Sequence, residues 1–198
     1  MDVMVNPRAT NSDLTAKARI RNAAMDLYAE HGEERVSLRA VAAEAGVTLG
    51  LVQHHFKTKA GLRDAVDQLV IEYFAAALAS AEPSDDPRQN AAARDAAVQK
   101  MLEETPTVVN YLRRAVLDPA NAPTHLLGVF IEFTRSEIRS LRDAGLASTK
   151  RSEALQVMAL MVRLVGELML LPMVDSVWEL VAEPADGEKP RLVIEVKG

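Results

Sequence analysis

The segment from residue 37 to residue 59, SLRAVAAEAGVTLGLVQHHFKTK, constrains the fold most, because it predicts two short helices joined by a tight turn. Ser37 and Thr48 stand where N-caps are needed, and their hydroxyls can accept hydrogen bonds from N–H groups at a helix start. Gly46 permits the left-handed backbone conformation that ends a helix, and Val47 can fill the small core between the helices. This pattern is typical of a helix-turn-helix, whose second helix enters the major groove of DNA.

Helical periodicity continues along the rest of the chain. Apolar residues recur at three- and four-residue spacing in a helix that ends at His31, and again in a long helix that starts near Lys59 with Thr58 as its cap. One helix is predicted to end at Leu171 and the next to begin at Pro172, because proline is favoured in the first turn of a helix. Further helices are predicted over residues 88–103, 106–117, 124–144, 149–171 and 172–181, followed by an extended arm over residues 192–196. The sequence therefore predicts an all-α fold.

Composition limits the classes of protein to which the chain can belong. It contains no cysteine, which excludes a disulfide, a thiolate metal site and a cysteine nucleophile. The net charge of −5 does not exclude a nucleic-acid partner, because residues 1–63 hold nine Lys or Arg against seven Asp or Glu. No secretory signal is visible, and Gly166, Glu167 and Pro172 interrupt the longest apolar stretch, which is too short to cross a membrane. A soluble, cytoplasmic protein is expected.

The helix-turn-helix segment also resembles a known family. The residues AVAAEAGVTLGLVQHHFKTKAGL are similar to the DNA-binding signature of the TetR/AcrR regulators, and the upstream segment ARIRNAAMDLYAEHG is similar to that family's first helix. The resemblance implies an Ω-shaped homodimer that binds a palindromic DNA operator as a repressor. It also implies release of the operator when a small-molecule effector enters the C-terminal domain.

Two domains are expected from the helical pattern and the resemblance together. Residues 1–58 are predicted to form the helix-turn-helix DNA-binding domain, with a polar N-terminal arm over residues 1–13. Residues 59–198 are predicted to form a larger helical domain for effector binding and dimerisation, which ends in the extended tail.

Side chains at the start of the second helix and on its flanks are the candidates for DNA contact. Gln53 is the strongest candidate for reading a base edge, because its amide can both donate and accept and can bind adenine in a bidentate manner. The family usually has Tyr at this position, so the base preference is expected to differ from that of relatives. The other DNA-binding candidates are Ser37, Arg39, Thr48, Leu49, Gly50, His54, His55, Lys57 and Lys59.

Each candidate also has a simpler interpretation. Thr48 can act only as a cap, Gln53 can be a solvated residue, and one of His54 and His55 can fill the core beside Phe56. Adjacent histidines on a helix point about 100° apart and no acidic ligand stands at helical spacing from this pair, so neither a metal site nor a cofactor is predicted. DNA contact is favoured because the basic residues gather on one rim of the helix-turn-helix.

The effector and dimer sites are less well defined by the sequence. Arg163 and Glu167 stand four residues apart in an apolar helix, where they can pair with each other, bond across a dimer interface or bind an effector. Structural pairing or a dimer contact is favoured over effector binding. Helices that line the ligand cavity in similar proteins carry the other effector candidates, Tyr111, His125, Phe130 and Phe133. Dimer contacts are expected from the last long helices, at Leu164, Leu168, Leu171 and Trp178.

Two other functions remain open at this point. A DNA-binding scaffold without a ligand would have the same helix-turn-helix, but a filled C-terminal core in place of a cavity. A helical enzyme is disfavoured, because the sequence shows no nucleophile with a base and an orienting partner, no glycine-rich phosphate loop and no His/Glu set spaced for a metal.

Overall fold

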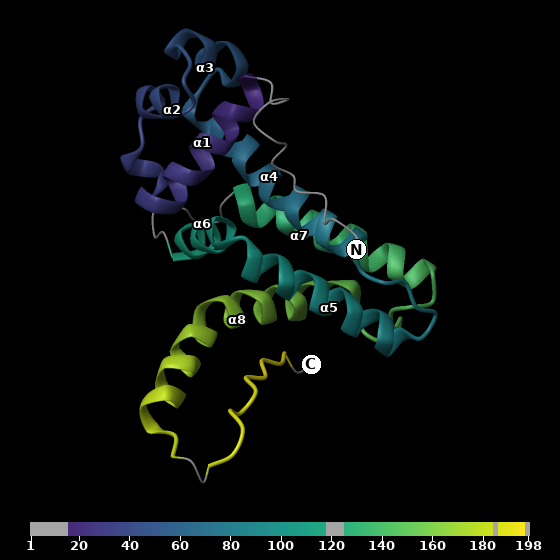
Figure 1. Ribbon diagram of the computed structural model, residues 1–198. Helices are drawn as coiled ribbons and strands as arrows, with labels where there is room; N and C mark the ends of the chain where they lie inside the picture. The colour runs from purple at the N-terminus through teal and green to yellow at the C-terminus, as the bar shows by residue number, and fades with distance from the viewer. Residues whose placement is uncertain (1–15, 118–124, 184–185, 197–198) are drawn as a thin grey trace. The chain divides into compact units, whose positions relative to one another are not determined.

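The computed structural model describes residues 16–117, 125–183 and 186–196 (Figure 1). Within these ranges all regular secondary structure is helical, so the predicted all-α fold is confirmed. The arm predicted over residues 1–13 lies outside the described residues. The elements are α1 (Ala16–His31), the 3-10 helix η1 (Glu33–Arg35), α2 (Leu38–Glu44), α3 (Leu49–Phe56), α4 (Lys59–Ala79), α5 (Pro87–Glu104), α6 (Pro106–Leu117), α7 (His125–Asp143) and α8 (Glu153–Val181).

By packing, the chain divides into two compact units. Unit 1 comprises residues 1–130 and unit 2 comprises residues 131–198, so that α7 begins in the first unit and ends in the second. A functional boundary after residue 58 stays a prediction, because a division by packing does not report which residues bind DNA and which bind an effector.

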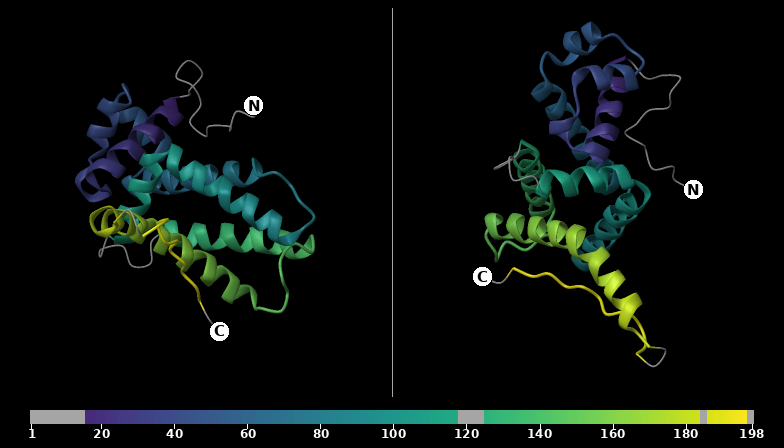
Figure 2. Two further views of the ribbon diagram at one scale, coloured as in Figure 1. Left: turned by 60° about the horizontal axis from the view of Figure 1, so that its bottom comes forward. Right: turned by 90° about the vertical axis from the view of Figure 1, so that its left-hand side faces the viewer.

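Unit 1 is built around α1 and α4. α1 packs against α2, α3, α4 and α6, and α4 packs in addition against α3 and α5. Both figures show α1, α2 and α3 as one cluster at the start of α4 (Figures 1 and 2). The fully buried side chains recur at the three- and four-residue spacing of the sequence, and they include Ile20, Ala24, Met25, Tyr28, Leu62, Val66, Leu69 and Val70.

The boundaries of α8 correct the sequence prediction at both of its expected breaks. α8 begins later than predicted, at Glu153, because Ser152 Oγ accepts a hydrogen bond from Leu155 N–H at 3.2 Å and caps the helix. It then continues through Pro172 to Val181, so the predicted break before Pro172 was wrong. A proline inside a helix costs about 3 kcal/mol. Here the flanking leucines and methionines favour the helix on both sides, and the helix continues.

Because α8 is continuous, its apolar segment is longer than the sequence analysis expected. With 29 residues, α8 is long and apolar enough to cross a membrane by length and composition alone, so the expectation that no segment reaches this length was wrong. The core helix of a soluble protein passes the same test, which makes a single helix of this kind weak support for a membrane span. Large apolar side chains are exposed on α8 at Met158, Leu160, Val162, Leu170, Met173, Val177, Leu180 and Val181.

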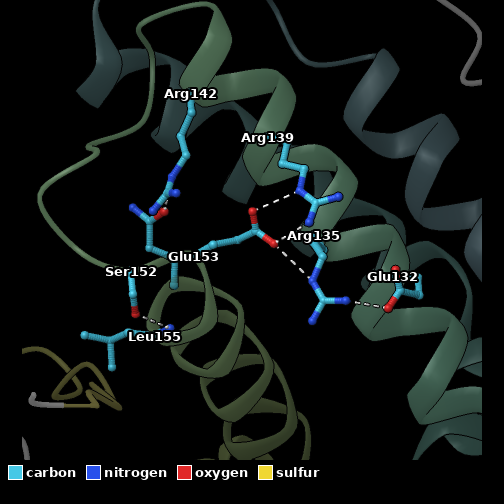
Figure 3. Close-up of polar contacts among 8 residues, drawn as sticks. Glu132, Arg135, Arg139, Arg142, Ser152, Glu153 and Leu155 are labelled. Atoms are coloured by element: carbon cyan, nitrogen blue, oxygen red, sulfur yellow. Dashed lines mark hydrogen bonds and ion pairs between the residues drawn. The ribbon is translucent and has the colours of Figure 1, made fainter.

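In unit 2, the carboxylate of Glu153 joins the end of α7 to the start of α8 (Figure 3). Its Oε1 lies 3.0 Å from Arg135 Nε, and Arg139 donates through Nε to Oε2 at 2.9 Å and through a terminal nitrogen to Oε1 at 3.0 Å. Arg142 Nε donates to Gln156 Oε1 at 2.8 Å and also joins α7 to α8. The hydrogen bonds from Arg139 hold the pKa of the Glu153 carboxyl below its usual value.

Replacing Glu153 with Gln is expected to lower the melting temperature by less than about 2 °C at neutral pH, because exposed ion pairs contribute little to stability. Since the folded-state pKa of Glu153 is lowered, the ionised carboxylate stabilises the fold above the pKa of an unfolded glutamate, about 4.3. This contribution disappears as the pH falls through the folded-state pKa. Thermal melts of Glu153→Gln and wild type should therefore converge in acid, whereas the exposed Glu179→Gln serves as the control and melts like wild type. A difference that persists in acid would show that Glu153 acts through packing.

Residues 186–196 lie along α8 without forming helix or strand. Lys189 Nζ is 2.6 Å from Asp175 Oδ1, and Ile194 fills the space beside Gly166, where a Cβ atom would overlap it. The tail is therefore extended, as predicted for residues 192–196, and it runs antiparallel to α8.

Candidate nucleic-acid interface

The predicted caps of α2 and α3 are present. Ser37 Oγ accepts a hydrogen bond from Ala40 N–H at 3.1 Å, and Thr48 Oγ1 accepts one from Leu51 N–H at 3.3 Å. Each hydroxyl satisfies an N–H group that has no partner within its own helix. The starts of both helices are therefore fixed by the residues that the sequence indicated.

The turn between α2 and α3 has the left-handed backbone conformation that was expected at Gly46. Gly46 has a φ of +63°, its N–H donates to Ala43 O at 3.1 Å, and the N–H of Val47 donates to Ala42 O at 2.9 Å. These two hydrogen bonds form a Schellman motif, in which a left-handed residue closes the helix. Val47 is half-buried and α2 packs against α3, so the turn holds the two helices together as a helix-turn-helix.

α3 has a buried side and an exposed side. Val52 and Phe56 are buried, whereas Gln53 and His54 are exposed. We call the exposed candidates the recognition face, which consists of Ser37, Arg39, Thr48, Gly50, Gln53, His54 and Lys57. The remaining candidates, Leu49, His55 and Lys59, are half-buried. The structure thus places all the predicted DNA-binding residues on or beside α2, α3 and the first residue of α4.

Two of the half-buried candidates also have contacts inside the protein. The ring of His55 lies edge-on to that of Phe56, with centroids 6.2 Å apart, which agrees with the interpretation that one histidine helps to fill the core. Lys59 Nζ donates to Glu34 O at 3.3 Å and joins the start of α4 to η1. His54 is the more exposed of the two adjacent histidines.

A turn that the sequence did not reveal sets the angle between α3 and α4. Lys57 has a φ of 64° and a ψ of −57°, and Thr58 N–H donates to Phe56 O at 2.7 Å, which makes a γ-turn. Thr58 Oγ1 accepts a hydrogen bond from Gly61 N–H at 3.0 Å, as expected for the cap of α4. Gly61 lies so close to the Phe56 carbonyl that a Cβ atom would overlap it. In the sequence, the sign of this close approach to the Phe56 carbonyl was Gly61, a glycine in the first turn of a helix.

Arg114 of α6 forms a second contact that sequence reasoning missed. Its Nε donates to Ala29 O at 2.7 Å, and a terminal nitrogen donates to Glu30 O at 2.6 Å. These carbonyls belong to the last turn of α1, where a cation is favoured by the helix dipole. α6 therefore holds the end of the helix against which α2 and α3 pack.

Comparisons with known proteins agree with this geometry. The family model described as "Bacterial regulatory proteins, tetR family" matches residues 20–66. The HTH-type transcriptional regulatory protein RaaS of Mycobacterium tuberculosis is 49% identical over 77 residues, which are 39% of this chain and 36% of that protein. Residues 20–66 therefore match the tetR family of bacterial regulatory proteins. The match to this curated relative spans little more than a third of its length.

Solved structures share the fold of this chain beyond the helix-turn-helix. A transcriptional regulator from Rhodococcus sp. Rha1 has a TM-score of 0.64 and 23% identity, over 83% of this chain and 87% of that chain. SmeT, in a complex with triclosan, has a TM-score of 0.56 and 20% identity, over 91% of this chain and 99% of that chain. At such low identities the likeness concerns the fold alone.

The predicted effector residues fall in both units. In unit 1, the hydroxyl of Tyr111 donates to Asp67 Oδ1 at 2.5 Å, and His125 Nδ1 lies 2.9 Å from Asp67 Oδ2. Phe130 is buried and packs edge-on against Phe74, with ring centroids 4.8 Å apart. In unit 2 the candidates Phe133, Arg163 and Glu167 are half-buried. Their role in binding an effector stays a prediction.

Asp67 was not among the candidates, although it is the residue that joins two of them. Its side chain is 1% exposed, and burial raises the pKa of the carboxyl, while the hydrogen bonds with Tyr111 and His125 act in the opposite direction. Burial, together with the Asp67 carboxylate, also raises the pKa of Tyr111, so the phenol remains a donor. The signal in the sequence was a charged residue inside the apolar stripe of α4.

The residues predicted for the dimer interface lie on α8. Leu168 is buried, and Leu164, Leu171 and Trp178 are half-buried. The most exposed apolar side chains of α8 are other residues, such as Met173 and Leu180. The dimer contacts therefore stay a prediction.

Proposed function

We propose that this TetR-family chain is a DNA-binding transcription regulator, and that it acts as a repressor released from a palindromic operator by a small-molecule effector. The observation that carries the proposal is the recognition face, which exposes Gln53 and His54 on α3 while Val52 and Phe56 are buried on the other side of that helix. Such a helix can enter the major groove without disturbing its own packing. The proposal assigns a binding function instead of catalysis, and it places the protein in the cytoplasm, where bacterial DNA is found.

The recognition face supports separate roles for its residues. The start of α3 at Thr48 presents backbone N–H groups and the positive end of the helix dipole, which favour a phosphate. Arg39 and Lys57 add positive charge on the same face, and phosphate contacts of this kind fix the position of a protein on DNA. Gln53 is left to read a base edge, for which its amide geometry suits adenine.

A homodimer is part of the proposal because a palindromic operator matches a protein with two-fold symmetry. The exposed apolar residues of α8 support it, since a dimer would remove them from water. In the dimer, the two recognition helices should lie about 34 Å apart, or a multiple of that distance, when both occupy DNA.

The effector is proposed to be a small molecule. One structural neighbour, SmeT, holds triclosan in its solved structure. In this chain, α4 begins directly after the turn that follows α3 and carries Asp67 and Phe74 beside the effector candidates of unit 1. A ligand that changes the packing of α4 would alter the spacing of the two recognition helices.

Selection of duplexes from a random pool by the purified full chain tests the proposal. We expect a palindromic consensus sequence, and an affinity for it that falls with salt concentration because phosphate contacts release counterions. Sedimentation should show a dimer on this duplex, and a screen of small molecules should find compounds that release it. The absence of sequence-selective binding at every salt concentration would overturn the proposal.

A further inference from the structure

A second cluster of polar side chains lies in unit 1, away from the recognition face. Asp64 and Asp67 stand one turn apart on α4, and His125 is the first residue of α7. His125 Nδ1 lies 2.9 Å from Asp67 Oδ2 and 3.5 Å from Asp64 Oδ1. One nitrogen and two carboxylate oxygens thus lie within 4.8 Å of one another. Their positions in the sequence are too far apart for a recognisable metal-binding spacing, which is why no metal was predicted.

We propose that Asp64, Asp67 and His125 bind one divalent first-row transition-metal ion, with Zn²⁺ as the reference ion. Imidazole nitrogen and carboxylate oxygen are both ligands of Zn²⁺, at about 2.0–2.2 Å. For a tetrahedral ion these bond lengths place neighbouring donor atoms about 3.4 Å apart. The two distances from His125 Nδ1 bracket this value, so only small side-chain movements are needed.

The surroundings of the cluster favour binding of an ion, because one carboxylate is buried and held in place by a hydrogen bond. The Tyr111 hydroxyl donates to Asp67 Oδ1 and leaves Oδ2 toward His125, so it orients the carboxylate for coordination through one oxygen. Asp67 is buried, and a bound cation would offset the loss of solvation of its charge. The side chains of His125 and Asp64 are 39% and 43% exposed, so an ion can enter from solvent.

Arg63 and Glu33 are the other charged groups near the cluster. A terminal nitrogen of Arg63 donates to Asp64 Oδ1 at 3.2 Å and competes with a metal for that oxygen. Glu33 is a further acidic group, and it interacts with both Arg63 and Asp67. Asp67 and His125 are therefore the principal ligands and Asp64 is the weaker one. With three protein ligands, the fourth position of a tetrahedral ion is left for water.

Titration of the metal-free full chain with Co²⁺, followed by competition with Zn²⁺, tests the site. The chain has four histidines and no cysteine, so few alternative strong ligands exist. We expect one ion per chain and the visible absorption of four-coordinate Co²⁺, which Zn²⁺ then abolishes. His125→Ala and Asp67→Asn should each weaken binding by more than about 100-fold, and Tyr111→Phe by roughly 10-fold.

The control is the double variant His54→Ala with His55→Ala, which removes the adjacent histidines of α3 and should bind Co²⁺ like wild type. Melting curves in the presence of a chelator identify any variant that fails to fold, and Asp64→Asn, at a half-exposed position, provides a further test with a smaller expected loss. Equal binding by wild type and His125→Ala, or loss of binding in the double variant, would overturn the proposal. The cluster would then be an ion pair that joins α4 to α7. None of these measurements involves DNA, so their outcome is separate from that of the proposed regulatory function.

Discussion

Replacing Arg39 and Gln53 together with alanine is expected to lower the affinity for the selected operator by roughly 100- to 1,000-fold. Loss of the base contact accounts for most of this effect, because one good bidentate pair gives about 1–3 kcal/mol of discrimination. Loss of the Arg39 phosphate contact should also make the salt dependence shallower by about one unit of slope. Anisotropy of a labelled duplex at several salt concentrations measures both effects.

The pair was chosen because both side chains are exposed on the recognition face, so that the melting temperature should not change. Lys59 would be a less specific choice, since it also donates to Glu34 O inside the protein. Arg88→Ala combined with Gln68→Ala removes the same residue types from exposed positions of α5 and α4, and it should leave DNA affinity unchanged. If Gln53→Ala alone keeps both the affinity and the base preference, Gln53 reads no base.

Gly61→Ala is expected to destabilise the fold by about 1–3 kcal/mol, the usual effect of forcing an added group into packed structure. The new Cβ atom would meet the carbonyl of Phe56, which is backbone and cannot turn aside like a flexible side chain. Relief requires a shift of the γ-turn at Lys57, and therefore a different angle between α3 and α4. Urea unfolding measures the loss of stability, and operator affinity should fall with it.

Gly50→Ala is the matched control for stability, because Gly50 also lies in the first turn of a helix. A Cβ atom there would meet only Thr48 Oγ1, at 3.9 Å, which is ordinary contact. Alanine is favoured over glycine in a helix, so this variant should be as stable as wild type or more stable by up to about 1 kcal/mol. If Gly61→Ala unfolds at the same urea concentration as wild type, the close approach to Phe56 does not hold the turn.

Local features of the fold could be predicted from the sequence because each depends on neighbouring residues. Ser37, Thr48 and Thr58 cap the three helices that follow them, and Gly46 has the left-handed backbone expected of it. Apolar spacing identified the buried sides of α1 and α4 for the same reason, since a helix repeats its face every three or four residues. The helix-turn-helix follows from these local rules alone.

Contacts between distant residues could not be predicted in this way. Asp67 and His125 are 58 positions apart, and their approach depends on how α4 and α7 pack. The contact of Arg114 with Ala29 O spans 85 positions. Pro172 shows the opposite failure, because a local rule for proline was outweighed by the helix-forming residues around it. The candidate DNA surface could therefore be predicted from the sequence, whereas the cluster of Asp64, Asp67 and His125 could not.

The backbone of Lys57 has a consequence for how this position can vary during evolution. A positive φ is unfavourable for any residue with a Cβ atom, by about 1–2 kcal/mol, and a glycine would adopt it freely. Selection for stability alone would therefore replace this lysine with glycine. Under the proposed function, the lysine persists because its charge faces DNA. Descendants that lose their operator should therefore acquire glycine here, so residue 57 would record whether a lineage still binds DNA.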